Sequence, residues 1–187
     1  ASAQAQVQAI LAGPVTLTAP DTGPWTISPE VLAEWLILRP TAGTEGGATL
    51  AVSLDGGRLA SYAQEIGAQV AITPTSAQFR FDEAAGALVP VVDSVPGRTL
   101  DVTATVAVIE SAAMGQERTV SLPLLSVRPA LASEDGPALG IVELLAEGQT
   151  RFAGSSASRV QNIIVGARQF DGVLVAPGEE FSFNHYL

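Results

Sequence analysis

The sequence predicts an α+β fold: antiparallel hairpins and short sheets packed with three to four helices, followed by a partial second α+β unit. Three observations predict it. Short alternating apolar runs separated by turn residues are typical of strands joined as hairpins. Apolar residues at helical spacing behind capping residues indicate helices between them. The two kinds of element do not alternate as regular βαβ units, which disfavours a doubly wound sheet.

The first predicted elements are a helix and a hairpin. Residues 3–11 place their apolar side chains on one helical face, and Gly13-Pro14 ends that helix. Residues 15–18 and 25–27 alternate on either side of the turn-forming segment 19–23, so they predict the two strands of a hairpin.

A second helix begins after Ser28, a suitable N-cap with Pro29 at the first helical position. We expect this helix over 28–38, ahead of a proline that cannot continue it. A loop over 41–47 and an alternating strand over 49–54 follow. The apolar stripe of the helix contains Val31, Leu32, Trp35 and Leu36.

A third helix is predicted after Asp55-Gly-Gly. Residues 77–81 and 87–92 predict two short strands around the turn 82–86. The buried face of the third helix contains Leu59, Tyr62, Ala63, Ile66 and Val70.

Residues 99–114 fit both a strand and a helical periodicity. Asp101 as a cap, Gly115 as a stop and the length of the segment favour a helix. Residues 118–127 then predict one strand. Pro123 places it at a sheet edge, because proline cannot donate a ladder hydrogen bond.

The segment 130–137 is rich in Ser, Glu, Asp, Gly and Pro, which is typical of a linker. We therefore expect a first domain over 1–128, a linker over 129–138 and a second unit over 139–187.

The second unit predicts one helix and two strands. Ser155 or Ser156 caps the helix and Asp171-Gly172 ends it. Residues 173–175 predict a strand, and 180–184 alternate as another, with Phe181 and Phe183 on one side. The helix is expected to bury Val160, Ile163, Ile164 and Ala167.

The chain is acidic, with a formal net charge of −10 over 187 residues and no Lys among its nine basic residues. Neither half carries the positive surface that binds nucleic acid, so a nucleic-acid partner is disfavoured. Anionic membrane surfaces are disfavoured for the same reason. No apolar stretch approaches the roughly 20 residues of a transmembrane helix.

The chain has no Cys and a single His, at position 185. A thiol nucleophile and a Cys-ligated zinc are therefore excluded, and a His-rich metal site cannot form. The sequence has no phosphate-binding loop either. We expect no catalytic residue, no metal and no cofactor in this chain.

Arg159 and Asn162 lie one helical turn apart and share a face with Gly166. We expect them to form one polar cluster with the turn Pro177-Gly178-Glu179, because a carboxylate bonded to a guanidinium satisfies both groups. Two interpretations stay open: the cluster braces the helix against the following segment, or it is a polar ligand site.

The last part of the chain carries three connected motifs. They are T-x-F at Thr150 and Phe152, R-x-x-N-I at Arg159, Asn162 and Ile163, and D-G-x-x-V-x-P-G-E-x-F-S-F-N over 171–184. This run resembles the opening of the VanW domain, named for an accessory protein of vancomycin-resistance clusters. The resemblance covers 139–187, and because the family block runs on, we expect an incomplete VanW domain. It singles out a motif cluster of Arg159, Asn162, Pro177, Gly178, Glu179, Phe181, Ser182, Phe183 and Asn184.

The region before the linker resembles the YoaR-like peptidoglycan-binding domain that commonly precedes VanW blocks. The matching features are the hairpin 14–17 with Trp25, the helix at 28–38, and Gly97-Arg-Thr-Leu-Asp101 before a helix. The resemblance implies an extracytoplasmic, cell-envelope location and peptidoglycan or its peptide stems as partner. Trp25 is a candidate for stacking on sugar, whereas Trp35 lies on an apolar stripe and is expected in the core.

Three functions follow from these observations. The leading one is a non-catalytic envelope module attached to a VanW domain, linked to wall maintenance or glycopeptide resistance. A second is part of an enzyme acting on wall precursors, with Glu179 and Glu180 as acid and base; adjacent strand residues point to opposite faces, which argues against that pair. L,D-transpeptidase activity is excluded, because it needs a Cys. A third is a structural scaffold.

Overall fold

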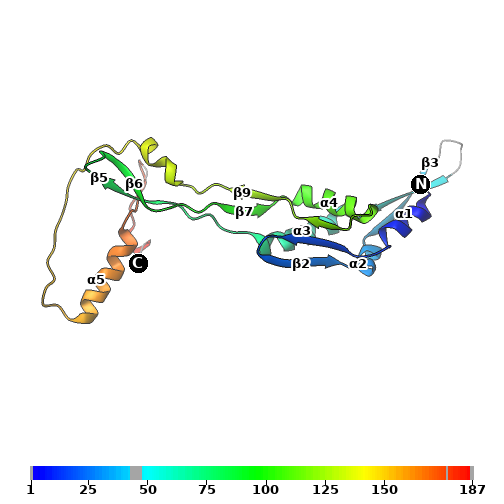
Figure 1. Ribbon diagram of the computed structural model, residues 1–187, viewed down its shortest axis with the longest axis horizontal. Coiled ribbons are helices and arrows are strands. Elements are labelled where there is room, and N and C mark those ends of the chain that lie inside the picture. The colour runs from blue at the N-terminus through cyan, green and yellow to red at the C-terminus, as the bar shows by residue number, and fades with distance from the viewer. Residues whose placement is uncertain (1, 43–47, 176, 186–187) are drawn as a thin grey trace. The chain divides into compact units, whose positions relative to one another are not determined.

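The computed structural model describes residues 2–42, 48–175 and 177–185. The fold is α+β, with helices and several small sheets (Figure 1). The chain forms two compact units, which we call unit 1 and unit 2. Unit 1 contains Ala1–Thr73 and Arg98–Val127, and unit 2 contains Pro74–Gly97 and Arg128–Leu187.

The sheet of unit 1 is built on the predicted hairpin. Strands β1 (Val15–Ala19) and β2 (Thr22–Ile27) pair antiparallel, with Leu17 opposite Trp25. The turn between them is only Pro20-Asp21, shorter than predicted, and Asp21 has a φ of 61°. On its other edge β1 pairs in parallel with β8 (Thr119–Ser121).

The second helix is shorter than the sequence predicts. Helix α2 spans Pro29–Glu34, capped by the Ser28 hydroxyl. The expectation of helix to residue 38 was wrong, because Leu36–Ala42 is strand β3 and pairs antiparallel with β4 (Ala48–Leu54). That pairing supplies the backbone hydrogen bonds that helix would have made. The rest of the predicted loop, 43–47, lies outside the described residues.

Two helices pack against each other in unit 1: α3 (Gly56–Val70) and α4 (Val102–Met114) (Figure 1). The predicted cap Asp101 accepts from the Ala104 amide, and Asp55, which was not predicted as a cap, accepts from the amides of Gly57 and Arg58. Helix α1 spans Ala3–Ile10, as predicted. The core contains Ile10, Val15, Leu17, Ile27, Leu32, Trp35, Leu54, Leu59, Ala63, Ile66, Val70, Leu100, Ile109, Ala112, Ala113 and Leu122.

The segment 118–127 is two strands, where the sequence predicts one. After β8 the chain passes through Leu122 and Pro123, and β9 (Leu124–Val127) pairs with β7 (Gly97–Leu100) in a separate sheet. Pro123 cannot donate a ladder bond, and its carbonyl accepts from the Asp101 amide at 3.0 Å. The proline therefore divides the predicted strand.

One arginine closes the end of unit 1 where two helices stop. The guanidinium of Arg118 donates, at 2.7–3.2 Å, to carbonyls in the last turn of α1, just after α1 and near the end of α4; the acceptors are Ala9, Ile10, Gly13, Pro14 and Ala113. The last carbonyls of a helix have no partner within the helix, and a cation suits that negative end.

A second arginine closes the other end. Arg98 donates from Nε to the carbonyl of Val70, the last residue of α3, at 2.9 Å. Its Nη2 reaches the Pro20 carbonyl at 3.4 Å, and Nη1 lies 3.5 Å from the Asp21 carboxylate. Arg98 and Asp101 belong to the motif Gly97-Arg-Thr-Leu-Asp101. This motif therefore supplies a donor to the end of α3 and the cap at the start of α4.

Unit 2 is built on the predicted hairpin of β5 (Gln78–Asp82) and β6 (Ala87–Val92). The 3-10 helix η1 (Ser133–Leu139) packs on β6, so the segment predicted as a linker contains ordered structure. Helix α5 (Ala157–Phe170) and the short η2 (Phe183–His185) complete the unit. Its core is small: Ala77, Phe79 and Leu88, with Phe81, Leu131 and Leu174 packed against them.

Each compact unit contains two separate segments of the chain. Residues 74–97 fall within the predicted first domain, yet they pack with 128–187. A compact unit need not coincide with a family domain, so the boundaries at 128 and 139 stay predictions.

Two predicted strands of unit 2 do not form. Residues 173–175 and the described part of 180–184 before η2 are irregular backbone. A strand needs a hydrogen-bonded neighbour, and no described segment pairs with either one. The predicted face of α5 is also less covered than expected, since Val160 and Ile163 are half-buried and Ile164 is 38% exposed.

Candidate functional site

The Asp171-Gly172 pair fixes the end of α5 to the hairpin of unit 2. The Asp171 carboxylate accepts from Arg80 on β5 at 2.7 Å. Gly172 has a φ of 78°, and a Cβ there would lie 2.9 Å from the Gln78 Cβ and 3.2 Å from the Phe79 backbone. Only glycine fits that conformation and approach without strain. The D-G motif therefore has a structural role.

Three phenylalanines form an aromatic cluster beside α5. The ring of Phe170 stacks on Phe183 with centroids 4.8 Å apart, and lies tilted against Phe181 at 6.1 Å. Phe181 and Phe183 were predicted to share a side, and both contact the same ring although they are not in a strand. They stay 48% and 56% exposed, so the cluster leaves apolar surface open to solvent.

The polar residues that the sequence singled out are exposed. Arg159 and Asn162 lie on α5 with exposed side chains, and no hydrogen bond joins the Asn162 side-chain amide to any residue that the structure describes. Ser182 and Asn184 are exposed as well. The cluster of Arg159 and Asn162 with the turn 177–179 stays a prediction.

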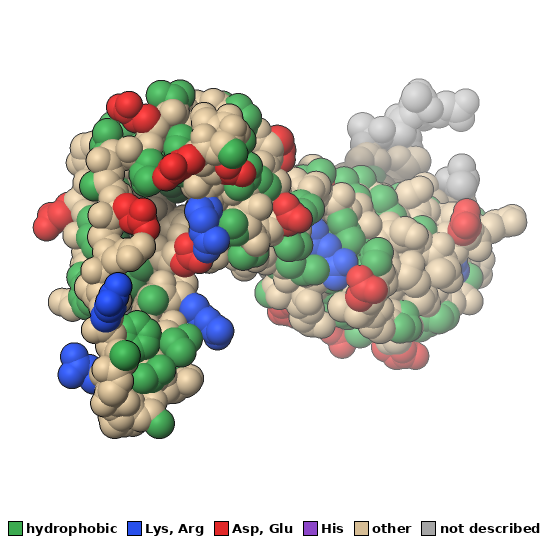
Figure 2. Space-filling model, turned by 60° about the vertical axis from the view of Figure 1, so that its left-hand side comes forward, with side chains coloured by type: hydrophobic (Ala, Val, Ile, Leu, Met, Phe, Trp, Pro, Cys, Tyr) green, Lys and Arg blue, Asp and Glu red, His purple; other side chains and the backbone are tan. Residues whose placement is uncertain are grey.

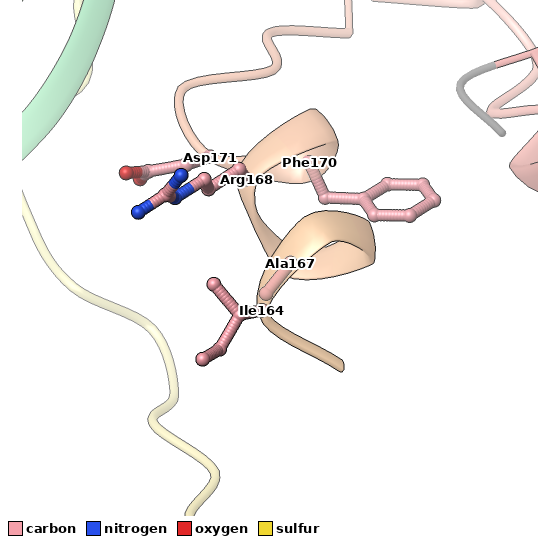
Figure 3. A pocket seen from close by; sticks show the side chains of 5 residues that line it. All are labelled: Ile164, Ala167, Arg168, Phe170 and Asp171. Atoms are coloured by element: carbon pink, nitrogen blue, oxygen red, sulfur yellow. The ribbon is translucent and has the colours of Figure 1, made fainter. Parts of the chain in front are cut away.

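Two shallow depressions lie along α5. One, at its C-terminal end, is lined by Ile164, Ala167, Arg168, Phe170 and Asp171. Figure 3 shows Ile164, Arg168 and Asp171 on one side of the helix end, with Phe170 pointing to the other. The second, at its N-terminal end, is lined by 150–155 and Val160, which include Arg151 and Phe152.

Arg151 and Arg168 were not singled out from the sequence. A signal for them was present: the 23 residues between Glu147 and Asp171 contain three Arg and no acidic residue. Counting charge over halves of the chain hides this local excess.

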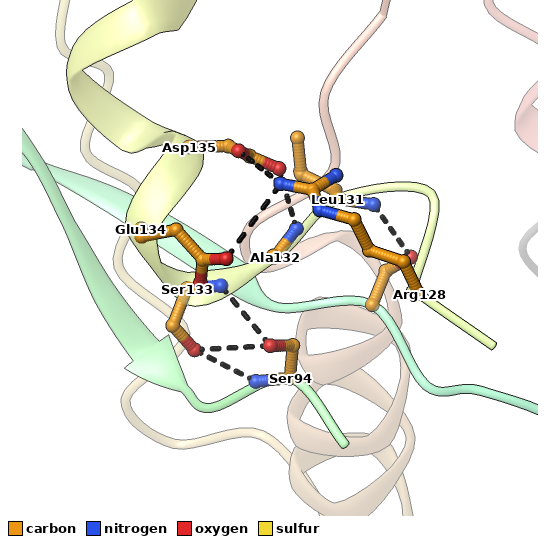
Figure 4. Close-up of polar contacts among 8 residues, drawn as sticks. Ser94, Arg128, Leu131, Ala132, Ser133, Glu134 and Asp135 are labelled. Atoms are coloured by element: carbon orange, nitrogen blue, oxygen red, sulfur yellow. Dashed lines mark hydrogen bonds and ion pairs between the residues drawn. The ribbon is translucent and has the colours of Figure 1, made fainter. Parts of the chain in front are cut away.

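A polar network joins the two chain segments of unit 2 (Figure 4). The amide of Ser94 donates to the Ser133 hydroxyl at 2.9 Å, and the amide of Ser133 donates to the Ser94 hydroxyl at 3.0 Å. Beside them Arg128 pairs with Asp135 and lies 3.7 Å from Glu134. The reciprocal bonds hold η1 against the end of β6.

The pKa of Asp135 is held below its ordinary value. The largest cause is the hydrogen bond that its carboxylate accepts from the Ala132 amide at 2.7 Å, and the second is the bond from Arg128. Both favour the charged form. The same pairing raises the pKa of Arg128.

Both tryptophans of unit 1 make contacts within the fold. Trp35 is buried, as predicted, and its ring lies 5.4 Å from that of Tyr62. Trp25 is half-buried against the core, and its Nε1 donates to the Gln69 amide oxygen at 3.0 Å. Stacking of sugar on Trp25 stays a prediction.

A third depression lies at the start of α3, between Trp35, Arg58 and Tyr62. Burial, and then the charge of Glu65, raise the pKa of Tyr62. No three His, Cys, Asp or Glu side chains gather as metal ligands within the described ranges.

The described helices are too short or too polar to cross a lipid bilayer.

No protein-family model matches the chain, and no curated protein matches it. The chain is similar to a solved structure described as "Structure of the Ldtfm-avibactam carbamoyl enzyme", at 18% sequence identity and a TM-score of 0.43. The match covers 65% of this chain and 44% of that one. A TM-score at this level does not establish a shared fold.

Proposed function

We propose that this chain is a non-catalytic module of the cell envelope that contacts peptidoglycan or its peptide stems outside the cytoplasm. We propose further that residues 139–187 belong to a VanW-type domain, with a YoaR-like domain before it, and that the protein serves wall maintenance or glycopeptide resistance.

One observation carries the proposal. The motif side chains of the VanW-like segment divide into two sets. Asp171, Gly172 and the phenylalanines at 181 and 183 make packing contacts, whereas Arg159 and Asn162 point to solvent. An exposed polar side chain on a braced helix is available to a ligand, which favours binding over a purely structural role.

Retention on purified sacculi tests the proposal. The full chain is incubated with sacculi at low and at moderate salt, and the bound fraction is compared with that of an unrelated acidic protein of similar charge. We expect weak but specific retention. Equal retention of the two proteins would contradict the proposal and would favour the third function, a structural scaffold. Release of soluble fragments from the sacculi would instead support the second function, part of an enzyme that acts on the cell wall.

A matched pair of variants sharpens the test. Asn162→Ala removes an exposed amide from the motif, and Gln161→Ala removes one from the neighbouring position of the same helix. We expect only Asn162→Ala to reduce retention, with the melting temperature nearly unchanged. Equal retention of the two variants would exclude Asn162 from the binding surface.

A further inference from the structure

The helix α5 and the segment before it form a basic region in an acidic protein. Between Glu147 and Asp171 the chain carries Arg151, Arg159 and Arg168 and no acidic residue, while its formal net charge is −10. Figure 2 shows Arg side chains around hydrophobic ones on the lower left, with acidic side chains gathered above them. Local charge therefore opposes the charge of the whole chain.

These three arginines differ from the arginines that hold the fold together. Arg98 and Arg118 donate to helix carbonyls, and Arg80 and Arg128 pair with carboxylates. In contrast, the arginines at 151, 159 and 168 form no ion pair with any residue that the structure describes. Their charges are thus available to an external anion.

Apolar side chains lie between them. Val160, Ile164 and Ala167 follow one another at spacings of four and three residues, so they share one face of α5. At about 100° per residue, Arg159 and Arg168 border this face from opposite sides. We call these five residues the α5 strip; the two shallow depressions described above lie at its ends.

A carboxylate also lines one end of the strip. Asp171 borders the depression at the C-terminal end, but its charge is paired with Arg80 at 2.7 Å. The net character of the strip is therefore apolar with a positive border.

We infer that the α5 strip binds the peptide stem of peptidoglycan through the stem's free carboxylates; this inference rests on the proposed function and names its site. A guanidinium matches a carboxylate with two parallel hydrogen bonds. Shallow apolar surface suits the methyl groups of alanine, which stems contain. The glycan chain carries acetyl methyl groups, but it has no free carboxylate where its lactyl groups bear stems.

The size of the strip fits a short peptide. Arg159 and Arg168 are nine positions apart, or about 13 Å along the helix axis at about 1.5 Å per residue. An extended stem of four or five residues, at about 3.3 Å each, reaches roughly 13 to 17 Å. Carboxylates at separate points of one stem can therefore meet both arginines.

The charge of the chain favours a short anion over a long one. An extended polyanion, such as a phosphate polymer or an anionic membrane surface, also meets the field of 19 acidic residues. A stem peptide carries only a few carboxylates and is confined to the strip.

Titration of the full chain with a soluble tetrapeptide stem tests the inference, with amide chemical shifts as the readout. We expect shifts confined to 150–171. We expect the double variant Arg159→Gln/Arg168→Gln to weaken binding by about tenfold or more, because charged hydrogen bonds are lost. The matched control is Arg39→Gln/Arg58→Gln, two exposed arginines of unit 1, which should bind as the unsubstituted chain does.

Three outcomes would overturn the inference: no shift in 150–171, equal loss in the control variant, or equal binding of a stem with amidated carboxylates. Stronger binding to anionic phosphatidylglycerol vesicles than to the stem would also overturn it, in favour of a membrane surface. Retention on sacculi without stem binding would refute the inference while the proposed function survives. Stem binding without retention on sacculi would refute the proposed function. The stem would then not be the ligand of this chain in the intact cell wall, so the inference would fail with it.

Discussion

Unit 1 and unit 2 are held together by different interactions. Sixteen described residues form the buried core of unit 1, and three form that of unit 2. Helix α4 buries four residues, whereas α5 buries none. Unit 2 relies instead on hydrogen bonds and ion pairs at Ser94, Ser133, Arg128 and Asp171.

The larger core stabilises unit 1, whereas the smaller core of unit 2 leaves apolar surface exposed. Burial of apolar area stabilises by roughly 25 cal/mol per Å², so the larger core makes unit 1 the more stable part. A helix that buries little of its apolar face keeps that face available for another molecule. Unit 2 is consequently where we place the ligand.

The largest expected effect is on unit 1. Arg118→Met removes the donors to five carbonyls at the ends of α1 and α4 while keeping a long apolar stem. We expect a loss of about 3–5 kcal/mol in the free energy of unfolding, because several carbonyls lose charged partners together. Denaturant unfolding followed by tryptophan fluorescence measures it, since both tryptophans lie in unit 1. Arg39→Met, an exposed position, is the control; equal losses would refute the role of Arg118.

A smaller loss is expected in unit 2 from Gly172→Ala. The added Cβ adopts a left-handed φ and meets β5 at 2.9 Å. We expect about 2 kcal/mol of destabilisation and faster amide exchange over 157–175. Gly178 also has a positive φ, of 85°, but apart from its chain neighbours no described residue lies within 4 Å of its Cβ position, so Gly178→Ala isolates the conformational cost of about 1 kcal/mol. Identical exchange in the two variants would show that α5 is not docked through Gly172.

The smallest effect depends on pH and is confined to unit 2. The pKa of Asp135 is lowered in the fold, so its contribution is complete above the ordinary carboxyl pKa and is lost as pH falls through the lowered value. We expect Asp135→Asn to speed hydrogen exchange at the Ala132 amide at pH 7. In the unsubstituted chain the protection of this amide from exchange should fall below pH 4, and in the variant this fall should be smaller. An unchanged acid dependence in this variant would show that other carboxylates control it.

The sequence singled out the segment that contains the candidate site, but not which of its residues pack and which are exposed. The motif D-G-x-x-V-x-P-G-E-x-F-S-F-N identified Gly172 and Phe183, because such residues at fixed spacing resemble a known domain. The motif does not tell a packing residue from an exposed one. That distinction needs the partners Arg80 and Phe170, which are set by tertiary contacts.

The sequence by itself determined the local elements of this protein. Helices begin after Ser28, Asp55 and Asp101, where they were predicted, since the cap at each start acts on amides within its own first turn. Only the tertiary structure decided which elements pair. Leu36–Ala42 is a strand because β4 lies beside it, residues 180–182 are not a strand because no described neighbour pairs with them, and 74–97 packs with 128–187. The physical reason is that local bonds depend on neighbouring residues, whereas strand pairing and core packing depend on segments distant in the chain.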